Sequence, residues 1–321
     1  MTPGMKIVVD GREVDFRSRL QSVEIVDKEG VSSDTISLVI ANPDQAFPLP
    51  PKGAKIEAWI NGDYFGSYTA ETVSAPCFPH VIEVTGKAAG FKGKEKETRE
   101  RHWDNSQLSK IVADIAEDLG LTASVDGAVG AHVYDWVGQV NESSVAFLER
   151  LAKRHDALFS IKDGRLIFAA RGAGRSPSGA DLTSSTITAA MIVPNTCRFE
   201  FSDRSQYAQV AASYTDRAAG LRKEVTALSD SAGTAIWRIG EQFADEAEAK
   251  SAAASKAKDM RRRQSKFSVE VVGNTAFRAG APVRFADVLR EIDGQPFILE
   301  TATHTVSKAG YRTRLDGHAK V

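Results

Sequence analysis

Residues 35–86, TISLVIANPDQAFPLPPKGAKIEAWINGDYFGSYTAETVSAPCFPHVIEVTG, decide the fold class, because a second stretch repeats their order of features. That second stretch is residues 266–317, KFSVEVVGNTAFRAGAPVRFADVLREIDGQPFILETATHTVSKAGYRTRLDG. In both, a strand pattern leads through an asparagine-containing turn to a Gly-Ala pair, a second strand, a glycine turn and two more strands. The order predicts two related β-domains, one near each end of the chain.

The anchor residues of the two stretches keep the same spacing. The residues that correspond are Gly53-Ala54 with Gly280-Ala281, Gly62 with Gly294, Ile36 with Phe267, and Val84 with Leu315. The two outer anchors are 48 residues apart in both stretches. Few identical residues align, so a chance similarity is the alternative to a duplication.

The first block carries clear strand and turn signals. Asp10-Gly11 and Asn61-Gly62 each separate two short alternating runs, which is typical of β-hairpins. Ile36, Leu38 and Ile40 occupy alternate positions of a strand pattern and should point inward. Many short strands divided by turn residues indicate a barrel or a sandwich.

Between the two blocks the pattern changes to a mixture of helices and strands. The first helix has an apolar stripe, is capped by Asn105 or Ser106 and ends at Gly120; the stripe comprises Leu108, Ile111, Val112, Ile115, Ala116 and Leu119. A second helix begins near Asn141 and leads into a hairpin that turns at Asp163-Gly164. Its predicted buried side comprises Phe147, Leu148, Leu151 and Ala152.

A long helix interrupts the last segment of the chain. It is predicted at about 245–263, with Asp245 and Glu248 at the spacing of a capping box. Its small-residue face, suited to close packing on a sheet, is predicted to be Ala247, Ser251, Ala254 and Ala257 or Lys258. We therefore predict a mainly β protein with an α+β insertion: a first β-domain at 1–100, a mixed α/β region at 101–175 and a second β-domain at 176–321.

Composition and charge exclude several classes of protein. The 321 residues carry 41 Lys and Arg against 42 Asp and Glu, a net charge of -1, so no global field attracts nucleic acid or an acidic membrane. Cys77 and Cys197 are the only cysteines, which excludes a disulfide framework and favours a reducing compartment. The N-terminus has no signal-peptide pattern, and no apolar run approaches the ~20 residues of a membrane span.

One stretch, NESSVAFLERLAKRHD at residues 141–156, contains residue types that could carry catalysis. Ser143 or Ser144 with His155 and Asp156 could be read as a triad, but on one helix the serines lie about 16–18 Å from the histidine along the axis. A nucleophile and its base must be within hydrogen-bond reach. We therefore interpret Asn141 and the two serines as helix-capping residues and Glu142 as an anion facing the helix dipole.

Other candidate sites are weaker. Six histidines, at 80, 102, 132, 155, 304 and 318, show no metal-ligand spacing, and His304 is expected to be a satisfied or half-exposed strand residue. The glycine-rich loop at residues 171–179 lacks the Gly-Lys-Ser/Thr of a phosphate-binding loop. The charged stretch at residues 92–101 is either a solvated strand or loop or a binding surface for a partner. The Arg261–Arg263 cluster either places cations at a helix C-terminus or forms a basic surface for a partner. No catalytic, cofactor-binding or metal-binding residue is predicted.

Three stretches together resemble the phage late control gene D family. They are SDTISLVIANPDQAFPLPPKGAKIEAWING at residues 33–62, QVNESSVAFLERLAKRHDALFSIKDGRLIF at residues 139–168 and GYRTRLDGHA at residues 310–319. The second is the most characteristic, with its Gln-x-Asn-Glu-Ser lead-in, Phe-Leu-x-Arg-Leu-Ala helix and Lys-Asp-Gly-Arg-Leu hairpin. The resemblance follows the family order over nearly the whole chain.

The resemblance implies a structural baseplate or tail hub of a contractile phage tail or a tail-like particle, related to the N-terminal part of type VI secretion spike proteins. It implies two tail-tube-like antiparallel β-barrels per chain and a homotrimer whose six barrels form a pseudo-six-fold ring between tail tube and spike. Partners would be the spike, the tube, and baseplate wedge and tape-measure proteins, in a virion assembled in the host cytoplasm. No cofactor, nucleic acid or membrane is expected.

The chain departs from larger relatives in carrying no spike repeats and no lysozyme-like domain, so both should belong to separate polypeptides. Two alternatives to the hub were considered, a tail-associated cell-wall hydrolase and a nucleic-acid-binding regulator. A hydrolase would need two acidic residues that converge in a cleft, and the sequence does not reveal such a pair. A nucleic-acid-binding regulator conflicts with the balanced charge. We expect no enzymatic activity.

Overall fold

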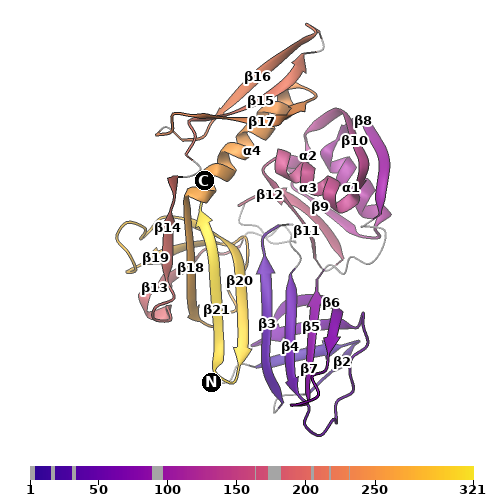
Figure 1. Ribbon diagram of the computed structural model, residues 1–321, viewed down its shortest axis with the longest axis vertical. Coiled ribbons are helices and arrows are strands. Elements are labelled where there is room, and N and C mark those ends of the chain that lie inside the picture. Colours follow the sequence, from indigo (N-terminus) through magenta and orange to yellow (C-terminus); the bar gives the residue numbers. More distant parts are fainter. Residues whose placement is uncertain are drawn as a thin grey trace.

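The computed structural model describes residues 4–15, 19–30, 34–88, 97–162, 164–172, 182–203, 206–216, 218–230 and 232–321. The lower half of Figure 1 holds two sets of strands side by side, one from each end of the chain. Above them lie the mixed middle region and a long helix with its own small sheet. The molecule is therefore mainly β with an α+β insertion, as predicted. No helix in the described ranges has the length and apolarity that a membrane crossing requires.

The first block of strands comes from the N-terminal end of the chain. Its strands are β1 (Met5–Val9), β2 (Arg12–Glu13), β3 (Leu20–Lys28), β4 (Thr35–Ala41), β5 (Lys55–Ile60), β6 (Asp63–Ser74) and β7 (Val81–Lys87). They pair in the order β3-β4-β7-β6-β5-β1-β2. Both predicted hairpins form, β1–β2 around Asp10-Gly11 and β5–β6 around Asn61-Gly62, and all four turn residues have positive φ, as a type I′ turn requires. Ile36, as predicted, is fully buried.

The second block comes from the C-terminal end. Its strands are β13 (Ser185–Thr188), β14 (Arg198–Phe201), β18 (Ser265–Val272), β19 (Pro282–Ala286), β20 (Phe297–Ser307) and β21 (Gly310–Ala319). They pair in the order β14-β18-β21-β20-β19-β13. Four phenylalanine rings, Phe199, Phe267, Phe285 and Phe297, pack at its centre with mostly edge-to-face geometry.

The two blocks have the same strand order, and the register of β4–β7 matches that of β18–β21. They differ at the outer strand, because β1 pairs antiparallel with β5 and β13 pairs parallel with β19. Leu38 on β4 lies opposite Val84 on β7, and Val269 on β18 lies opposite Leu315 on β21 at the same relative positions. The Gly-Ala pairs are also equivalent. Gly53 N donates to Ala70 O (2.8 Å), and Gly280 N donates to Leu299 O (2.7 Å). A β-bulge follows directly in both β6 and β20. The duplication predicted from the sequence is therefore confirmed at the level of strand order.

A single strand pair joins the two blocks into one continuous sheet. Residues 301–307 of β20 pair antiparallel with residues 22–28 of β3. His304, at the centre of this pair, is fully buried. Its Nε2 lies 3.1 Å from Phe277 O and its Nδ1 lies 2.7 Å from Tyr311 Oη, so it is a satisfied core residue, as expected.

The middle region has its own core. Its elements are β8 (Thr98–Gln107), α1 (Leu108–Asp118), β9 (Thr122–Val125), α2 (Gly127–Gly130), β10 (Val133–Ser143), α3 (Ser144–Arg154), β11 (Ala157–Lys162) and β12 (Arg165–Ala170). β8 pairs with β10, and β9, β12 and β11 form a second small sheet. Helices α1 and α3 bury their predicted apolar faces, although Leu119 at the end of the α1 stripe is only half-buried.

Two predicted helix starts are wrong. The residue before α1 is Gln107, and Asn105 and Ser106 belong to β8, where Asn105 takes a positive φ. Helix α3 begins at Ser144 and is capped by Ser143, one of the predicted capping residues, whereas Asn141 and Glu142 lie at the end of β10. In both places the strand continues further than its residue composition indicated, because cross-strand pairing in β8–β10 outweighs the local capping preference. Residues 92–96 of the charged stretch lie outside the described ranges.

The long helix α4 (Glu246–Gln264) packs on a three-stranded sheet of β15 (Gln209–Asp216), β16 (Leu221–Leu228) and β17 (Ile236–Phe243). Its predicted start is confirmed: Asp245 Oδ1 accepts from Glu248 N (2.8 Å). Its predicted small-residue face is confirmed at Ala257, which is buried, and is wrong at Ala247 and Ala254, which are exposed. The face that packs on the sheet is formed by Ala249, Ala252, Ala253, Ala257 and Met260. The η2 turn (Ala189–Met191) lies between β13 and β14 of the second block.

Candidate functional site

The residues considered as a triad occupy separate structural roles. Ser143 Oγ accepts from Ala146 N (3.2 Å) and caps α3. Ser144 is fully buried, and its Oγ lies 3.4 Å from Arg101 Nη2. His155 lies at the opposite end of the same helix. The serines therefore have no base within reach, and the interpretation of this stretch as scaffold is supported.

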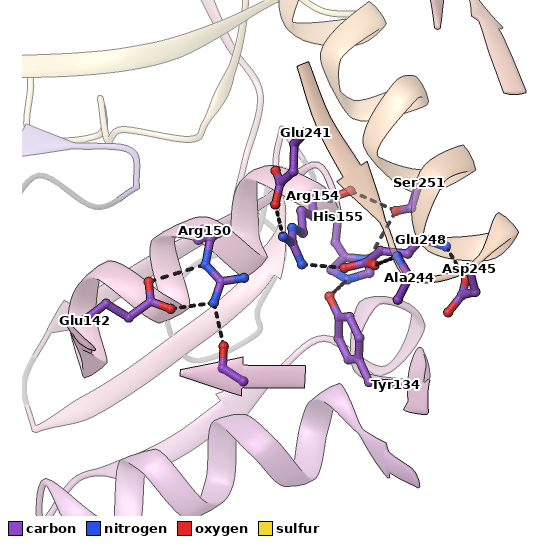
Figure 2. A network of polar contacts seen from close by, with 11 residues as sticks. Tyr134, Glu142, Arg150, Arg154, His155, Glu241, Ala244, Asp245, Glu248 and Ser251 are labelled. Carbon is purple, nitrogen blue, oxygen red and sulfur yellow. Dashed lines mark hydrogen bonds and ion pairs between the residues drawn. The ribbon is translucent and has the colours of Figure 1, made fainter. Parts of the chain in front are cut away.

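His155 contacts a different serine, which raises the question of a nucleophile and base again. Its Nδ1 lies 3.1 Å from Ser251 Oγ, and its Nε2 lies 2.6 Å from Tyr134 Oη (Figure 2). Ser251 Oγ donates to Arg154 O (2.9 Å), so its proton is already used. Burial, the neighbouring His132 and Arg154 lower the pKa of His155 to about 3. A histidine this acidic is a poor general base, and the pair is a structural contact.

Arg154 joins α3 to α4 and β17. Its guanidinium forms ion pairs with Glu248 and Glu241, and Glu248 is 3% exposed (Figure 2). The second carboxylate oxygen of Glu248 accepts from Ala244 N (3.1 Å) at the start of α4. The pKa of Arg154 is raised, because the two glutamates outweigh the opposing effect of its burial. One carboxylate thus both caps a helix and neutralises an arginine from another region.

Arg150 and Arg154 both pair with groups of the chain itself. Arg150 Nη2 donates to Gly138 O (2.8 Å), and the guanidinium pairs with Glu142 (Figure 2). Glu142 therefore neutralises Arg150 from the end of β10 and is not a first-turn anion of α3. The Phe-Leu-x-Arg-Leu-Ala pattern contains Arg150, and Arg154 follows it. Both arginines make their contacts with other elements of the chain.

The arginine cluster at residues 261–263 also turns partly inward. Arg262 is 6% exposed, and its guanidinium donates to both oxygens of Asp156, at 2.6 and 3.0 Å. Lys258 Nζ lies 3.0 Å from the same carboxylate. Asp156 adopts a positive φ at the exit from α3. The central arginine of the cluster is therefore part of the junction between the middle region and α4.

A buried polar triad joins all three parts of the chain. Lys162 Nζ lies 2.9 Å from Asp27 and 2.9 Å from Asp34. Asp27 Oδ2 also accepts from Ala279 N (2.9 Å) in the second block. Burial and the neighbouring Asp27 raise the pKa of Asp34 to about 6. The pKa of Asp27 is held below its usual value by Lys162, against the opposing effect of burial. The pKa of Lys162 is raised by the two carboxylates despite its burial.

Sequence reasoning missed this triad. Lys162 precedes the Asp163-Gly164 turn, where a lysine is ordinarily solvated, and Asp163 itself lies outside the described residues. Asp27 lies near the end of β3 and Asp34 directly precedes β4, and neither belongs to a motif. Their only shared signal is charge, and that signal does not identify partners more than a hundred positions apart.

An open cleft of about 870 Å³ lies between α3, α4 and β17. Charges of both signs line it, including Arg238, Glu241 and Asp259. Among the described residues that line it, Ser255 Oγ donates to Lys153 O (2.5 Å) and His318 Nδ1 lies 2.9 Å from Ala319 O. Neither forms a nucleophile–base pair. No group of three or more potential metal ligands occurs in the described ranges.

Comparison with known proteins identifies what the chain is similar to. The family described as phage tail baseplate hub (GPD) matches residues 75–310, more than half of the chain. A probable baseplate hub protein of Escherichia phage 186 is 25% identical over 367 aligned residues, covering 100% of this chain and 94% of the relative.

Two solved structures share the fold. The tail protein from Neisseria meningitidis MC58 superposes with a TM-score of 0.76 at 13% identity, covering 100% of this chain and 97% of that one. A component of the type VI secretion system of E. coli, the c3393 protein, superposes with a TM-score of 0.56 at 9% identity, covering 98% and 77%. The arrangement of the described elements is therefore one that tail and secretion-system proteins use.

Proposed function

The chain belongs to the phage tail baseplate hub (GPD) family, and we propose on this basis that three copies close into a ring that connects the tail tube to the central spike. It is a structural protein of the baseplate hub, a component of the virion tail. The proposal concerns how it assembles and what it joins. In it, residues 1–100 and 176–321 hold the two ring-forming barrels, and residues 101–175 form the region between them.

The observation that carries the proposal is the doubled strand order. The first block runs β3-β4-β7-β6-β5-β1, and the second runs β14-β18-β21-β20-β19-β13, with matching registers at β4–β7 and β18–β21. A chain with two equivalent blocks supplies six similar surfaces when three copies assemble. Such a ring suits a junction between a six-fold tube and a three-fold spike, and its closure needs head-to-tail contacts around an axis.

The polar junctions support a rigid subunit. The Lys162 triad ties the middle region to both blocks, and the Arg154 pairs tie it to α4 and β17. A hub that transmits force between tube and spike needs fixed geometry between its parts, and buried ion pairs specify such geometry. The spike and the tube are the proposed direct partners. Wedge and tape-measure proteins are proposed as further contacts, in a particle assembled in the host cytoplasm.

We also propose that the chain cleaves no cell wall itself. The Ser251–His155 contact lacks a free serine proton, and the charged cleft offers no nucleophile–base pair among its described lining residues. Zymography of the purified protein on peptidoglycan should give no clearing, with lysozyme as the positive control. A cleared band at the mass of this chain would contradict the proposal.

Light scattering tests the ring. The native mass of the purified protein should be measured alone over a range of concentrations, and then mixed with the spike protein of the same particle. A species near three times 34.7 kDa, alone or bound to the spike, is the expected result. A monomer in both samples, with no complex formed, would refute the trimeric ring while leaving the family membership intact.

A further inference from the structure

The junction between the two blocks shows how a strand of one block pairs with a strand of the other. Within the chain, β20 pairs with β3 so that Ala302 lies opposite Asp27 and His304 lies opposite Ile25. The junction extends by one more bond, because Glu29 N donates to Glu300 O (2.9 Å). It uses the part of β20 that follows the β-bulge, on the side away from β21.

Each strand of this junction has an equivalent in the other block. β6 is equivalent to β20, because Ala70 and Leu299 make the same two bonds with a Gly-Ala pair before the bulge. β14 is equivalent to β3, because Phe199 lies opposite Phe267 as Ile25 lies opposite Ile36. The equivalent of the β20–β3 junction would therefore join β6 to β14.

Within one chain β6 and β14 do not meet. β14 ends the sheet and pairs only with β18 among the described strands. β6 pairs with β5 only as far as Thr69, so the side of residues 72–74 that faces away from β7 has no strand partner in the described ranges. Phe201 on β14 is 62% exposed, and Phe78, in the segment that follows β6, is 90% exposed.

We infer that β6 of one copy pairs antiparallel with β14 of a second copy, in the register that β20 uses on β3. This inference rests on the proposed ring and specifies its contact. The register places Val73 opposite Phe201, Ser74 opposite Glu200 and Ala75 opposite Phe199. Two unpaired strand edges are thereby satisfied, and an exposed phenylalanine gains an aliphatic cross-strand neighbour.

The proline that follows β6 is compatible with this pairing. Pro76 O accepts from Val81 N (3.4 Å), so the polar backbone atoms of Pro76 face β7. Adjacent residues of a strand direct their backbone groups to opposite sides, so Val73 and Ala75 face the second copy. The N–H that Pro76 lacks would not be used there. By the same alternation, Ser74 and Glu200 form a non-hydrogen-bonded pair, in which side chains approach most closely.

Cysteine cross-linking tests the register. The register also brings Cys77 and Cys197 of neighbouring copies opposite each other, so the test is made in a Cys77→Ser/Cys197→Ala background. Ser74→Cys with Glu200→Cys is the in-register pair, and Ser74→Cys with Arg198→Cys is the control, since Ser74, Glu200 and Arg198 are all exposed in the single chain. Diamide is the oxidant, and it takes up the two electrons and two protons released when two thiols form one disulfide.

The expected result is covalent dimers and trimers from the in-register pair at least about tenfold more abundant than from the control. The protein could be a trimer by light scattering and yet give the same yield of covalent cross-links with the in-register and the control cysteine pairs, or none with either. That result would overturn the β6–β14 contact and leave the ring standing. A monomer under every condition, with or without the spike, would overturn both.

A second variant tests the same edge without cysteines. Phe201→Asp should raise the concentration needed for assembly by about tenfold or more, because it places a charge in the strand pair. Leu221→Asp, at a side chain 61% exposed on β16, is the matched control and should assemble like the parent protein. Circular dichroism should give the same melting curve for both variants as monomers. Unchanged assembly of Phe201→Asp would overturn the inference.

Discussion

Lys162 and Asp27 lie 135 residues apart in the sequence, yet the lysine ammonium is 2.9 Å from the aspartate carboxylate. The side chains are 18% and 14% exposed. The same carboxylate accepts from Ala279 N, so it contacts the middle region and the second strand block at once. This contact therefore joins the first strand block, the middle region and the second strand block.

The first prediction follows from this triad. Lys162→Met should lower the free energy of unfolding by about 3–5 kcal/mol at pH 7.5, because two buried carboxylates lose their cation. The loss should shrink at pH 5. The pKa of Asp34 is already raised to about 6 in the intact protein, so that carboxylate can take up a proton in the variant. Urea unfolding at the two pH values measures it.

Lys153→Met is the control for this substitution, since the Lys153 side chain is 72% exposed in an ion pair on the surface of α3. It should cost under about 0.5 kcal/mol at either pH. An equal loss for both lysine variants would mean that the triad contributes nothing specific to stability.

The second prediction concerns Arg154 and Glu248. A double-mutant cycle of Arg154→Met and Glu248→Gln should give a coupling free energy of about 2 kcal/mol or more, because the pair is buried and hydrogen-bonded. The exposed pair of Lys153 with Glu149 is the matched cycle, on the same helix. There the coupling should be about 0.3–0.5 kcal/mol. Similar values in the two cycles would contradict the role of Arg154 at the α3–α4 junction.

The third prediction concerns acid sensitivity. The pKa of His155 is lowered to about 3 and that of His304 to about 4, chiefly by burial. The folded state thus binds fewer protons than the unfolded state below pH 6.5, and stability present above that pH is lost as the pH falls toward 4. The loss should be about 1.4 kcal/mol per pH unit for each histidine. Asp34 opposes it between pH 6 and 4, because its pKa is raised.

His155→Gln isolates one contribution. Unfolding free energies measured between pH 6.5 and 4.5 should fall less steeply in this variant, by about 1.4 kcal/mol per pH unit. His102→Gln is the control, at a side chain 61% exposed. A parallel pH dependence in the His155 variant and the parent protein would show that His155 is not the group that titrates on unfolding.

The fourth prediction uses two equivalent glycines of the repeat. A Cβ on Gly317 would lie 2.3 Å from Ile298 O, whereas a Cβ on Gly86 would lie 3.0 Å from Thr69 O. Gly317→Ala should therefore cost about 1–3 kcal/mol or more, and Gly86→Ala clearly less. Gly240→Ala, where no atom lies within 4 Å, should change stability by about 0.5 kcal/mol at most. Thermal unfolding of the three variants gives the order, and a reversed order would contradict the packing described.

The fifth prediction separates scaffold from catalysis in the stretch first suspected of chemistry. Ser143→Ala should lose one capping bond and about 1 kcal/mol of stability, with assembly of particles unaffected. Leu148→Asp should prevent folding, because it buries a charge in a fully buried position. Particle assembly scored by electron microscopy tests the first. A well-folded Ser143→Ala protein that forms no particles would indicate a role beyond capping.

Turns and helix starts could be predicted from the sequence because they depend on residues that are close together in the chain. Asp10-Gly11 and Asn61-Gly62 form hairpins since these residues tolerate the positive φ that the turns need. Asp245 starts α4 because its carboxylate reaches the N–H of Glu248. The duplication could also be predicted, since the spacing of apolar residues and glycines is kept even where the two stretches share few identical residues.

The tertiary structure alone decided how these elements meet. Alanines surround much of α4, so the sequence offered no basis for choosing the face with Ala249 and Ala253 over the one with Ala247 and Ala254. The pairing of β20 with β3, and the burial of Lys162 with Asp27, join residues more than a hundred positions apart. Such contacts depend on where whole blocks lie relative to one another, and a charge or a strand edge can find its partner only once those blocks have packed.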